Sequence, residues 1–401
     1  MSLIVQKFGG TSVANAKLIF SAAKKAIKDY KKGNNVIVVV SAQGNTTDEL
    51  IEKAKEINKE PSKREMDVLL SSGEQISAAL MAMAIEKLGY PVVSLLGWQA
   101  RINSSSNYGD SIIEEINTTR IKKELDKKNI IVLAGFQGIN KYEDITTLGR
   151  GGSDTSAVGI ASTLNATRCK IYTDVEGVFT ADPRKVKDAI KLDYISYDEM
   201  LALSTSGAKV LNSRAVEIGK KHNVEIEVLS STKDVPGTIV KEPTNMEKRV
   251  VSGITKNDDV ALISVLNILD TPDCMFKLFS KLYSKDIKVG TMLQNKTAKG
   301  KRTLSFTVNK EDYGLCLETL KNHLENLDSD AKVTGDKEIS KVSIIGAGMF
   351  RCAGIVSKIF ETLYTEQIDI LACVSGEIKV SLIVREKYAD KAVLALHKAF
   401  F

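Results

Sequence analysis

The hydrophobic positions of residues 1–240 alternate between continuous apolar runs and helical spacing. Leu3–Phe8 is an apolar run, whereas apolar residues at 18, 22 and 26 give Val13–Tyr30 the period of a helix. Val36–Val40 is an unbroken β-branched run, typical of a strand buried on both faces. The same spacing predicts strands at Val92–Leu95, Ile130–Phe136 and Lys170–Thr173, and helices at Arg64–Leu88, Thr155–Leu164, Tyr197–Leu203 and Ser213–His222. This alternation predicts an α/β domain with a mostly parallel sheet, whose ligand sites lie at the carboxyl ends of the strands.

Residues 241–249 (KEPTNMEKR) are polar and contain a proline, so we place a linker between two domains there. The part after the linker contains an internal repeat. An offset of 81 residues lays one set of large apolar residues onto another: Phe279, Leu282, Tyr283 and Ile287 onto Phe360, Leu363, Tyr364 and Ile368. The two copies, 258–336 and 337–401, each read β-α-β-β-α.

The two copies end differently. The first has a plausible last strand near Ala331–Gly335, whereas the second ends inside its last helix. We expect the short strand Val250–Thr255 to complete the second sheet, so that 250–257 belong with 337–401. The alternative is a second sheet with an open edge, or one that pairs with another chain.

Composition narrows the class of protein. The chain has 401 residues, 43% of them hydrophobic, which suits two to four globular domains and excludes disordered and coiled-coil classes. The net charge of +6 is mild and dispersed, so we expect no nucleic-acid partner. We expect no membrane association, because the apolar runs are far shorter than the ~20 residues of a span and no signal-peptide pattern is visible. Five scattered cysteines suggest free thiols in a cytoplasmic protein.

The segment Lys7-Phe8-Gly9-Gly10-Thr11-Ser12 directly follows the first predicted strand. Paired glycines let backbone N–H groups approach an anion, and the following helix presents its positive end. Lys7 supplies a mobile charge of the kind that binds phosphates. The alternative is a tight turn in which Thr11 or Ser12 caps the helix.

Residues 149–156 (GRGGSDTS) combine three glycines with hydroxyl residues ahead of a predicted helix. Arg150 can form two parallel bonds with a carboxylate. Asp154 lies among expected backbone donors, where a carboxylate stays ionised and can hold an ammonium group. The alternative is a flexible loop.

Residues 172–184 (YTDVEGVFTADPR) follow another predicted strand. Tyr172 and Phe179 have rings that could stack on a base. Asp174, Asp182 and Arg184 could contact ribose or phosphates. The alternative is a turn, because Asp-Pro is also a turn signal.

Two charged residues stand apart from these loops. Glu74 lies in a helical stretch of small and apolar residues, where a carboxylate needs a partner such as a ligand amine. Its alternative is an exposed acid at a helix start. Lys209, in GAKVL (207–211), could face phosphate near a helix start, although taken alone an exposed lysine is the better explanation.

The segment Gly346-Ala347-Gly348 follows a predicted strand in the manner of a dinucleotide fingerprint. The third glycine is absent, because position 351 is Arg, and the matching part of the first repeat has no glycines. We therefore reject NAD binding there. The Walker A pattern is absent as well.

Jointly, these segments resemble the aspartokinases, ATP-dependent kinases of L-aspartate that open the synthesis of lysine, threonine and methionine. The motifs occur in the family's order over residues 4–211: KFGGTSV (7–13), SAQGNTTDEL (41–50), SSGEQIS (71–77), GRGGSDTSA (149–157), YTDVEGVFTADPR (172–184) and GAKVL (207–211). Residues 250–401 resemble tandem ACT domains. The resemblance implies a monofunctional enzyme with an amino-acid-kinase α/β/α sandwich around a mostly parallel sheet over 1–240. Two ferredoxin-like (βαββαβ) ACT domains would follow, over 258–336 and over 250–257 plus 337–401.

The resemblance also implies residue roles. Lys7, Gly9 and Gly10 would hold the transferred phosphoryl group, and the rest of ATP would contact Thr173, Asp174, Phe179, Asp182, Arg184, Lys209 and Val210. Arg150 would bind the α-carboxylate of aspartate and Glu74 and Asp154 its ammonium end, beside Ser41, Thr47, Gly151, Gly152 and Ser153. The attacking side-chain carboxylate is ionised at pH 7, so catalysis would be positioning and charge stabilisation by Lys7, Asp154, backbone N–H groups and Mg²⁺. We expect Mg²⁺ to be held by ATP and not by protein ligands.

The sequence departs from the family's usual residues at four places. Ala42-Gln43-Gly44 replaces Ala-Met-Gly, and Asn212-Ser213 replaces His-Pro. Asp273 replaces a glycine after Pro272, and the strand that commonly reads V-D-M-I-x-Q-N is VGTMLQN (289–295) here. We expect none of these to touch the phosphate-binding elements, and the last two to affect effector choice.

ACT modules generally bind small amino acids between paired copies. The resemblance implies feedback inhibition by lysine, alone or with threonine, through a two-state change of the two halves. The candidate effector residues are Asp270, Asp273, Met275, Phe276, Thr291, Met292, Gln294, Asn295, Ser375 and Glu377. ACT pairing across chains implies a homodimer or a dimer of dimers, and the length leaves no room for the homoserine dehydrogenase domain that some relatives carry.

Two other classes fit parts of the sequence. Glutamate 5-kinase, acetylglutamate kinase and UMP kinase share the fold, but they lack the tandem repeat, and Arg150 with Glu74 suits an amino acid better than a nucleotide. A non-catalytic amino-acid sensor is the second alternative. Intact Lys7, Arg150 and Asp154 argue against it.

Overall fold

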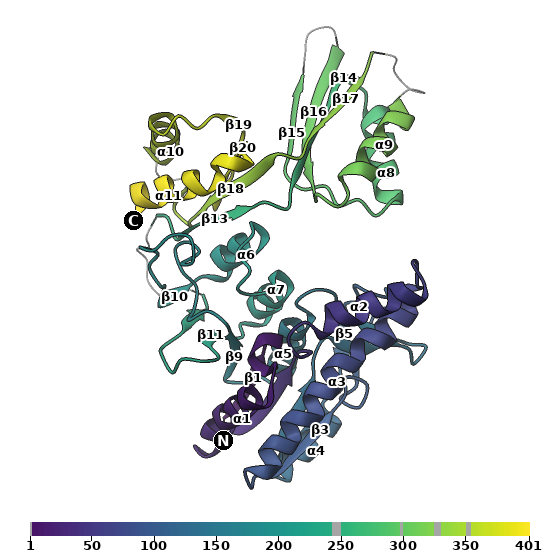
Figure 1. The fold of residues 1–401 in the computed structure, drawn as a ribbon, viewed down its shortest axis with the longest axis vertical. Coiled ribbons are helices and arrows are strands. Elements are labelled where there is room, and N and C mark those ends of the chain that lie inside the picture. The colour runs from purple at the N-terminus through teal and green to yellow at the C-terminus, as the bar shows by residue number, and fades with distance from the viewer. Residues whose placement is uncertain (1, 243–249, 297–299, 325–329, 350–353) are drawn as a thin grey trace. The chain divides into compact units, whose positions relative to one another are not determined.

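The structure is a computed structural model that describes residues 2–242, 250–296, 300–324, 330–349 and 354–401 (Figure 1). The chain forms two compact units. Unit 1 comprises residues 1–179, 190–204 and 209–246, and unit 2 comprises 180–189, 205–208 and 247–401. Of the expected linker over 241–249, residues 243–249 lie outside the described residues.

The core of unit 1 is an eight-stranded sheet in the order β10-β12-β11-β9-β1-β2-β6-β3. All neighbouring strands run parallel except β11 and β12. β2 and β6 are buried almost throughout, as their apolar composition predicts. The strands are β1 (Leu3–Phe8), β2 (Asn35–Val40), β3 (Val92–Leu95), β6 (Ile130–Ala134), β9 (Arg168–Thr173), β10 (Tyr194–Ile195), β11 (Ile226–Ser230) and β12 (Thr238–Val240).

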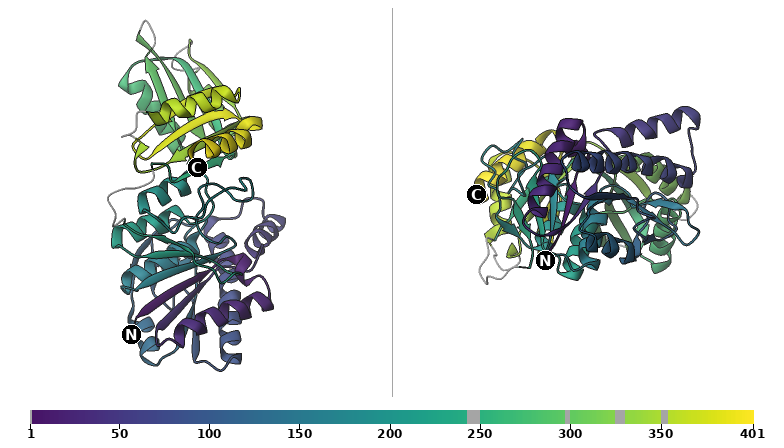
Figure 2. Two further views of the ribbon diagram at one scale, coloured as in Figure 1. Left: turned by 90° about the vertical axis from the view of Figure 1, so that its left-hand side faces the viewer. Right: turned by 90° about the horizontal axis from the view of Figure 1, so that it is seen from below.

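Helices cover this sheet, as the turned views in Figure 2 show. α1 and α3 pack on each other and against β2 and β6, and α5 contacts β1, β2, β9 and α7. A small sheet in the order β5-β4-β7-β8 completes unit 1. Its strands are β4 (Ile102–Ser104), β5 (Ile113–Ile116), β7 (Gln137–Ile139) and β8 (Ile145–Thr147). The helices are α1 (Ala16–Tyr30), α2 (Thr46–Ile57), α3 (Lys63–Lys87), α4 (Thr119–Asp126), α5 (Gly152–Thr163), α6 (Tyr197–Thr205) and α7 (Ser213–His222).

Two features of these helices differ from the expectations. The first helix begins at Ala16, because the Asn15 side chain accepts a hydrogen bond from the Leu18 amide; a short 3-10 turn, η1 (Gly10–Val13), precedes it. The cap is therefore neither Thr11 nor Ser12. α3 is long and apolar enough to cross a membrane by length and composition alone. It packs against α1, α2, β3, β6 and β8, so packing within unit 1 explains its apolar composition.

Unit 2 contains the two repeats, each with a four-stranded sheet and two helices. The first has sheet order β15-β16-β14-β17 and the second β13-β18-β20-β19. The first copy comprises β14 (Ala261–Leu269), α8 (Pro272–Ser284), β15 (Met292–Lys296), β16 (Lys301–Val308), α9 (Tyr313–Leu324) and β17 (Lys332–Asp336). The second comprises β18 (Ile339–Ile345), α10 (Gly354–Thr365), β19 (Ile370–Ser375), β20 (Lys379–Arg385), η4 (Glu386–Tyr388) and α11 (Ala389–Phe400).

The edge strand of the second sheet comes from the segment before the first repeat. β13 (Gly253–Asn257) pairs antiparallel with β18, in the position that β17 occupies in the first copy. The strand begins at Gly253 and not at Val250. The Val250 carbonyl lies so close to Gly346 that a Cβ atom at position 346 would come within 1.9 Å of it. This close approach explains the glycine that imitates a dinucleotide fingerprint.

Residues 180–189 also pack into unit 2, although they lie within the predicted N-terminal domain in sequence. Ala181 and Val186 are buried in the core of the second repeat with residues of β18, β20 and α11. The buried Thr180 Oγ1 lies 2.8 Å from Nε2 of His397 on α11, and the Ile254 amide donates to the Thr180 carbonyl. The second repeat therefore closes its core with a segment from earlier in the chain.

Candidate active site

Three loops converge where neighbouring strands β1, β2 and β9 end. The Gly44 amide donates to the Gly10 carbonyl at 3.0 Å, and the Gly9 amide donates to the Tyr172 carbonyl at 3.3 Å. A Cβ atom on Gly10 would lie 2.5 Å from the Ala42 carbonyl oxygen. Position 10 therefore requires glycine because the backbone of the next loop passes directly over it.

Lys7 and Asp154 form an ion pair at the centre of this strand edge. Lys7 Nζ lies 2.6 Å from Asp154 Oδ1, and both side chains are largely buried. Asp154 belongs to the first turn of α5, and its Oδ2 accepts a hydrogen bond from the Asn212 amide at 3.2 Å. The structure thus brings together the two residues assigned to catalysis, from positions 147 residues apart in sequence.

Glu74 lies in the middle of α3 and is only 3% exposed, so the alternative of an exposed acid at a helix start is wrong. Its Oε1 accepts a hydrogen bond from the Ala42 amide at 2.9 Å. Its Oε2 is buried with no hydrogen-bond partner among the described residues. Burial raises the pKa of Glu74 to about 7, although the Ala42 hydrogen bond and the charge of Lys7 oppose the shift. An ammonium group would satisfy the unpartnered oxygen.

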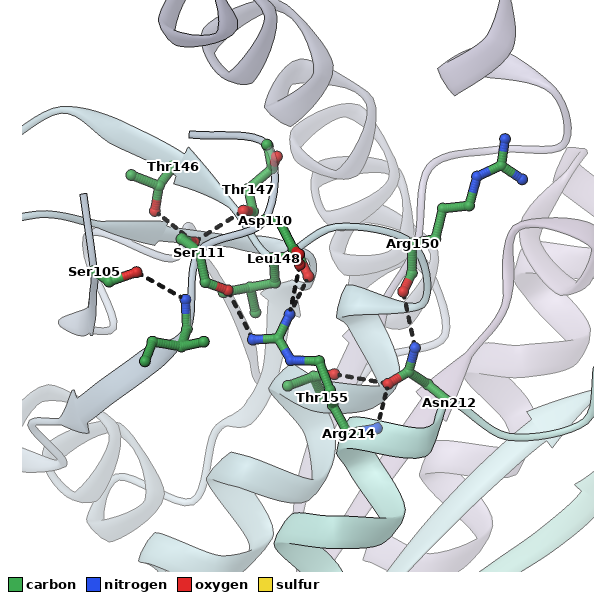
Figure 3. A network of polar contacts seen from close by, with 12 residues as sticks. Ser105, Asp110, Ser111, Thr146, Thr147, Leu148, Arg150, Thr155, Asn212 and Arg214 are labelled. Atoms are coloured by element: carbon green, nitrogen blue, oxygen red, sulfur yellow. Dashed lines mark hydrogen bonds and ion pairs between the residues drawn. The ribbon is translucent and has the colours of Figure 1, made fainter. Parts of the chain in front are cut away.

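The Arg150 loop precedes α5. Gly151 caps this helix with φ at 72°, a left-handed conformation that favours glycine, and Gly152 and Ser153 are buried. Figure 3 shows the exposed Arg150 side chain extending away from Asn212, whose amide contacts the Arg150 carbonyl. The structure gives the Arg150 guanidinium no ion-pair partner among the residues it describes, so this group can meet an anion.

Ser41 and Thr47 flank the loop after β2 and are both half-buried. The Ser41 amide donates to the Phe8 carbonyl at 3.2 Å, and Thr47 lies in the first turn of α2. Gly73 of α3 faces the same loop, because a Cβ atom there would lie 2.7 Å from the Ala42 Cβ. The loop is therefore held between β1 and α3.

Three of the predicted nucleotide residues, Thr173, Asp174 and Phe179, lie at or after the end of β9. Thr173 Oγ1 donates to Asp174 Oδ1 at 3.1 Å, Asp174 is exposed, and Phe179 is half-buried. The expectation that Tyr172 stacks on a base is wrong. Its ring is buried and stacks on Phe8, with centroids 4.6 Å apart.

The remaining predicted nucleotide residues lie elsewhere. Asp182 and Arg184 belong to unit 2, where their side chains pair with each other through two contacts of 3.0 Å. Lys209 is exposed and Val210 half-buried, in a turn of unit 1. α7 begins only at Ser213, so Lys209 is not at its start.

The predicted effector residues gather partly around Arg302 in the first repeat. Arg302 pairs with Asp270 and donates to Gln294 Oε1 at 2.7 Å. Lys296 adds a second cation 2.9 Å from Asp270. These contacts lower the pKa of the Asp270 carboxyl, with the Lys296 hydrogen bond as the largest cause. Arg302, which the sequence analysis did not identify, thus connects the loop before α8 with strand β15.

The other predicted effector residues are less connected. Asp273 pairs with Lys277 of the same helix at 2.8 Å, and the Thr291 amide donates to Thr307 Oγ1 at 2.9 Å. The remainder are half-buried or exposed, with no side-chain bond described to the Arg302 cluster: Met275, Phe276, Met292, Asn295, Ser375 and Glu377.

Sequence reasoning missed three residues that hold the site together. The Asp67 carboxylate, 1% exposed, accepts bonds from the Thr147 amide, the Thr147 hydroxyl and the Gly109 amide. Asn212 and Arg214 contact the Arg150 loop and its flanks, as Figure 3 shows. The change at 212–213 contacts the residues assigned to aspartate, because the Asn212 amide donates to Asp154 and its side chain to the Arg150 carbonyl. Of these three residues, only Asp67 had a signal in the sequence, because it is an acidic residue on the apolar face of a predicted helix.

The sequence profile of the Amino acid kinase family matches residues 2–230, and that of an ACT domain matches residues 342–400. The aspartokinase of Geobacillus stearothermophilus is 47% identical over 401 residues, covering 100% of this chain and 97% of the relative. Aspartokinase 2 of Bacillus subtilis is 44% identical, covering 100% and 98%.

Solved structures agree with these matches. The aspartate kinase from Synechocystis is 37% identical with a TM-score of 0.56, covering 100% of this chain and 69% of that one. E. coli aspartokinase III in complex with aspartate and ADP has a TM-score of 0.85 at 22% identity, and the same enzyme with lysine and aspartate has 0.76; both cover 100% of both chains and show the fold alone. With close relatives over its whole length, the chain belongs to the amino acid kinase family and, within it, to the aspartokinases, which makes it an aspartate kinase.

Proposed function

We propose that the chain transfers the γ-phosphoryl group of ATP to the side-chain carboxylate of L-aspartate at the carboxyl edge of the unit 1 sheet. The observation that carries this assignment is the buried Lys7–Asp154 pair. The unpartnered Oε2 of Glu74 supports it as a site for the substrate ammonium group. The product, 4-phospho-L-aspartate, would serve as the first intermediate of lysine, threonine and methionine synthesis.

Aspartate binds through charge in this proposal. The Arg150 guanidinium takes the α-carboxylate, since its fork geometry matches a carboxylate. Glu74 takes the ammonium end, with Asp154 beside it. Ser41, Thr47 and Ser153 are assigned to the same substrate, with Gly151 and Gly152 leaving room for its approach.

The reaction needs no strong base, because the attacking carboxylate has an ordinary pKa near 4. A substrate side-chain oxygen forms a bond to the γ-phosphorus, the bond from that phosphorus to the bridging oxygen breaks, and ADP leaves. Lys7 and the amides of Gly9 and Gly10 stabilise the charge on the transferred group. Asp154 holds the Lys7 ammonium in place.

ATP contacts are assigned to Thr173, Asp174, Phe179, Lys209 and Val210, while Asp182 and Arg184 stay sequence-based predictions. Mg²⁺ would be supplied with the nucleotide. Asp154 Oδ1, the central carboxylate oxygen, is already engaged by Lys7, which supports metal binding through phosphate oxygens. The magnesium would neutralise charge on the phosphates.

Regulation is assigned to unit 2. We propose lysine, alone or with threonine, as the inhibitor, at the Arg302–Asp270–Gln294 cluster of the first repeat. E. coli aspartokinase III, whose fold this chain shares, was solved with lysine and aspartate, which supports an amino-acid effector. An amino acid offers a carboxylate for Arg302 and an ammonium for Asp270.

Assembly and location complete the proposal. The exposed aromatic residues Phe276, Tyr283, Phe360 and Tyr364 lie on the helices of the two repeats, which supports a homodimer or a dimer of dimers formed through unit 2. The cysteines that the structure describes are free thiols, which supports a reducing cytoplasmic location: Cys169, Cys274, Cys316 and Cys373.

The decisive experiment is ATP-dependent hydroxamate formation from L-aspartate, with and without millimolar lysine or threonine. We expect turnover with aspartate that lysine suppresses. Turnover that neither amino acid changes would leave the kinase assignment and remove the regulatory one. Turnover with glutamate or UMP but not with aspartate would refute the substrate assignment.

A further inference from the structure

The first turn of α7 is bound to the Arg150 loop through Asn212. Its Nδ2 donates to the Arg150 carbonyl at 2.8 Å, and its backbone amide donates to Asp154 Oδ2 at 3.2 Å. Its Oδ1 caps α7 by accepting from the Arg214 amide at 2.9 Å. One residue thus connects a helix end to two residues assigned to the substrate, and Figure 3 shows its contact with Arg150.

Gly151 leaves the space that this arrangement needs. A Cβ atom at position 151 would lie 2.4 Å from Asn212 Nδ2 and 2.9 Å from Asn212 Cβ. The Asn212 side chain therefore packs directly against the backbone that follows Arg150. No longer side chain at 151 is compatible with the contact.

Arg214, in the same helix turn, binds the backbone just before the Arg150 loop. Its guanidinium donates to the Leu148 carbonyl and to the Ser111 carbonyl, each at 2.7 Å, and lies 3.2 Å from Asp110 Oδ1. The loop is consequently held on both sides of Arg150 by a single helix turn. Among the described residues no hydrogen bond or ion pair holds the Arg150 guanidinium, so its placement depends on this backbone.

We propose that Asn212 is a positioning residue for aspartate binding, acting through the backbone of Arg150 and the carboxylate of Asp154. This inference rests on the proposed function, because it assumes that Arg150 and Asp154 meet aspartate. It assigns a role to a position where the chain differs from the His-Pro that aspartokinases commonly carry.

The test uses the full chain and the hydroxamate assay. Asn212→Ser and Asn212→Asp both keep a helix-capping oxygen but lose the amide donor to Arg150. We expect each to raise the KM for aspartate about 10- to 100-fold, because a small displacement of a binding group costs that much. The KM for ATP should change less than about twofold, with the melting temperature nearly unchanged. Ser213→Ala, in the same turn without the contact, is the matched control.

The outcomes separate the two proposals. If the unmodified enzyme shows no turnover with aspartate, the proposed function fails before the variants are compared. If it turns over normally and the Asn212 variants match Ser213→Ala, the positioning role is overturned. A rise with Asn212→Asp alone would assign the effect to the added charge and also overturn it. Equal loss of kcat with both KM values unchanged would indicate a merely structural role.

Discussion

At the scale of single residues, the site is dominated by buried charge. Glu74 is almost inaccessible, and one of its oxygens lacks a hydrogen-bond partner among the described residues. A carboxylate in this position costs stability unless a ligand satisfies it. The stability of unit 1 and the binding of substrate are therefore coupled through one side chain.

Replacing Glu74 by Gln should stabilise the free enzyme while weakening aspartate binding. Because the folded pKa of about 7 lies above the unfolded value of 4.5, the wild type loses stability as the pH rises between these values. Gln keeps the acceptor for the Ala42 amide and carries no charge. Above pH 7 the variant should gain up to about 3 kcal/mol, from the size of that shift.

Melting curves at pH 5 and pH 8 measure this effect. The single tryptophan, Trp98, lies in unit 1, so its fluorescence reports that unit alone. The difference between variant and wild type should be larger at pH 8. A Glu74→Gln variant that is destabilised at pH 8, or that keeps the wild-type KM for aspartate, would contradict the assignment.

At the scale of elements, α3 holds the small sheet in place. Asp67 binds the Thr147 amide at 2.9 Å and its hydroxyl at 2.6 Å, which fixes β8. The Thr147 carbonyl in turn accepts from the Ser111 hydroxyl, and the Ser111 carbonyl accepts from Arg214. A chain of hydrogen bonds thus runs from α3 through β8 to α7.

Removing the Asp67 carboxylate should destabilise unit 1. Asp67→Ala leaves the buried Thr147 amide without a partner, which should cost about 2–3 kcal/mol. Urea unfolding followed by Trp98 fluorescence measures the loss. Glu86→Ala, an exposed acid on the same helix, is the control and should stay within about 0.5 kcal/mol of wild type. Equal effects of the two substitutions would show that Asp67 does not anchor β8.

At the scale of the whole molecule, unit 2 includes a segment from a distant part of the sequence. Residues 180–189 complete the core of the second repeat, where Lys185 also pairs with Asp390 of α11 at 2.9 Å. Thr180 and His397 meet within that core. A fragment of unit 2 that begins after the linker would therefore lack part of its own core.

The buried His397 should make unit 2 sensitive to acid. Burial lowers the pKa of His397, although Asp188 opposes the shift. The unfolded chain then takes up a proton near pH 6.5 that the folded unit resists, so stability falls as the pH drops below that value. His397→Gln removes the titration, and its unit 2 should lose less stability between pH 6.5 and pH 5.

Circular dichroism melts compared with Trp98 fluorescence isolate unit 2, because fluorescence reports unit 1 only. His222→Gln, an exposed histidine on α7 in unit 1, is the matched control. Identical acid sensitivity of the His397 and His222 variants would refute the assignment to His397.

The sequence alone determined the motifs and the strongly patterned elements, but it predicted neither α2 and α4 nor the strands of the small sheet. Burial on both faces makes β2 a continuous β-branched run, and the repeat keeps Leu282 and Leu363 fully buried in equivalent helices. These patterns are readable because side-chain burial follows the local period of a strand or a helix. The glycines of the loops are readable too, because close backbone approach permits few other residues.

Only the tertiary structure decided which polar groups meet. Asp67 lies 80 residues from Thr147, Asn212 lies 62 from Arg150, and Thr180 lies 217 from His397. No local period encodes such contacts, because they arise where packed elements bring unrelated segments together. The same reason places residues 180–189 in unit 2, leaves Tyr172 buried against Phe8, and brings Asn212 against the Arg150 loop.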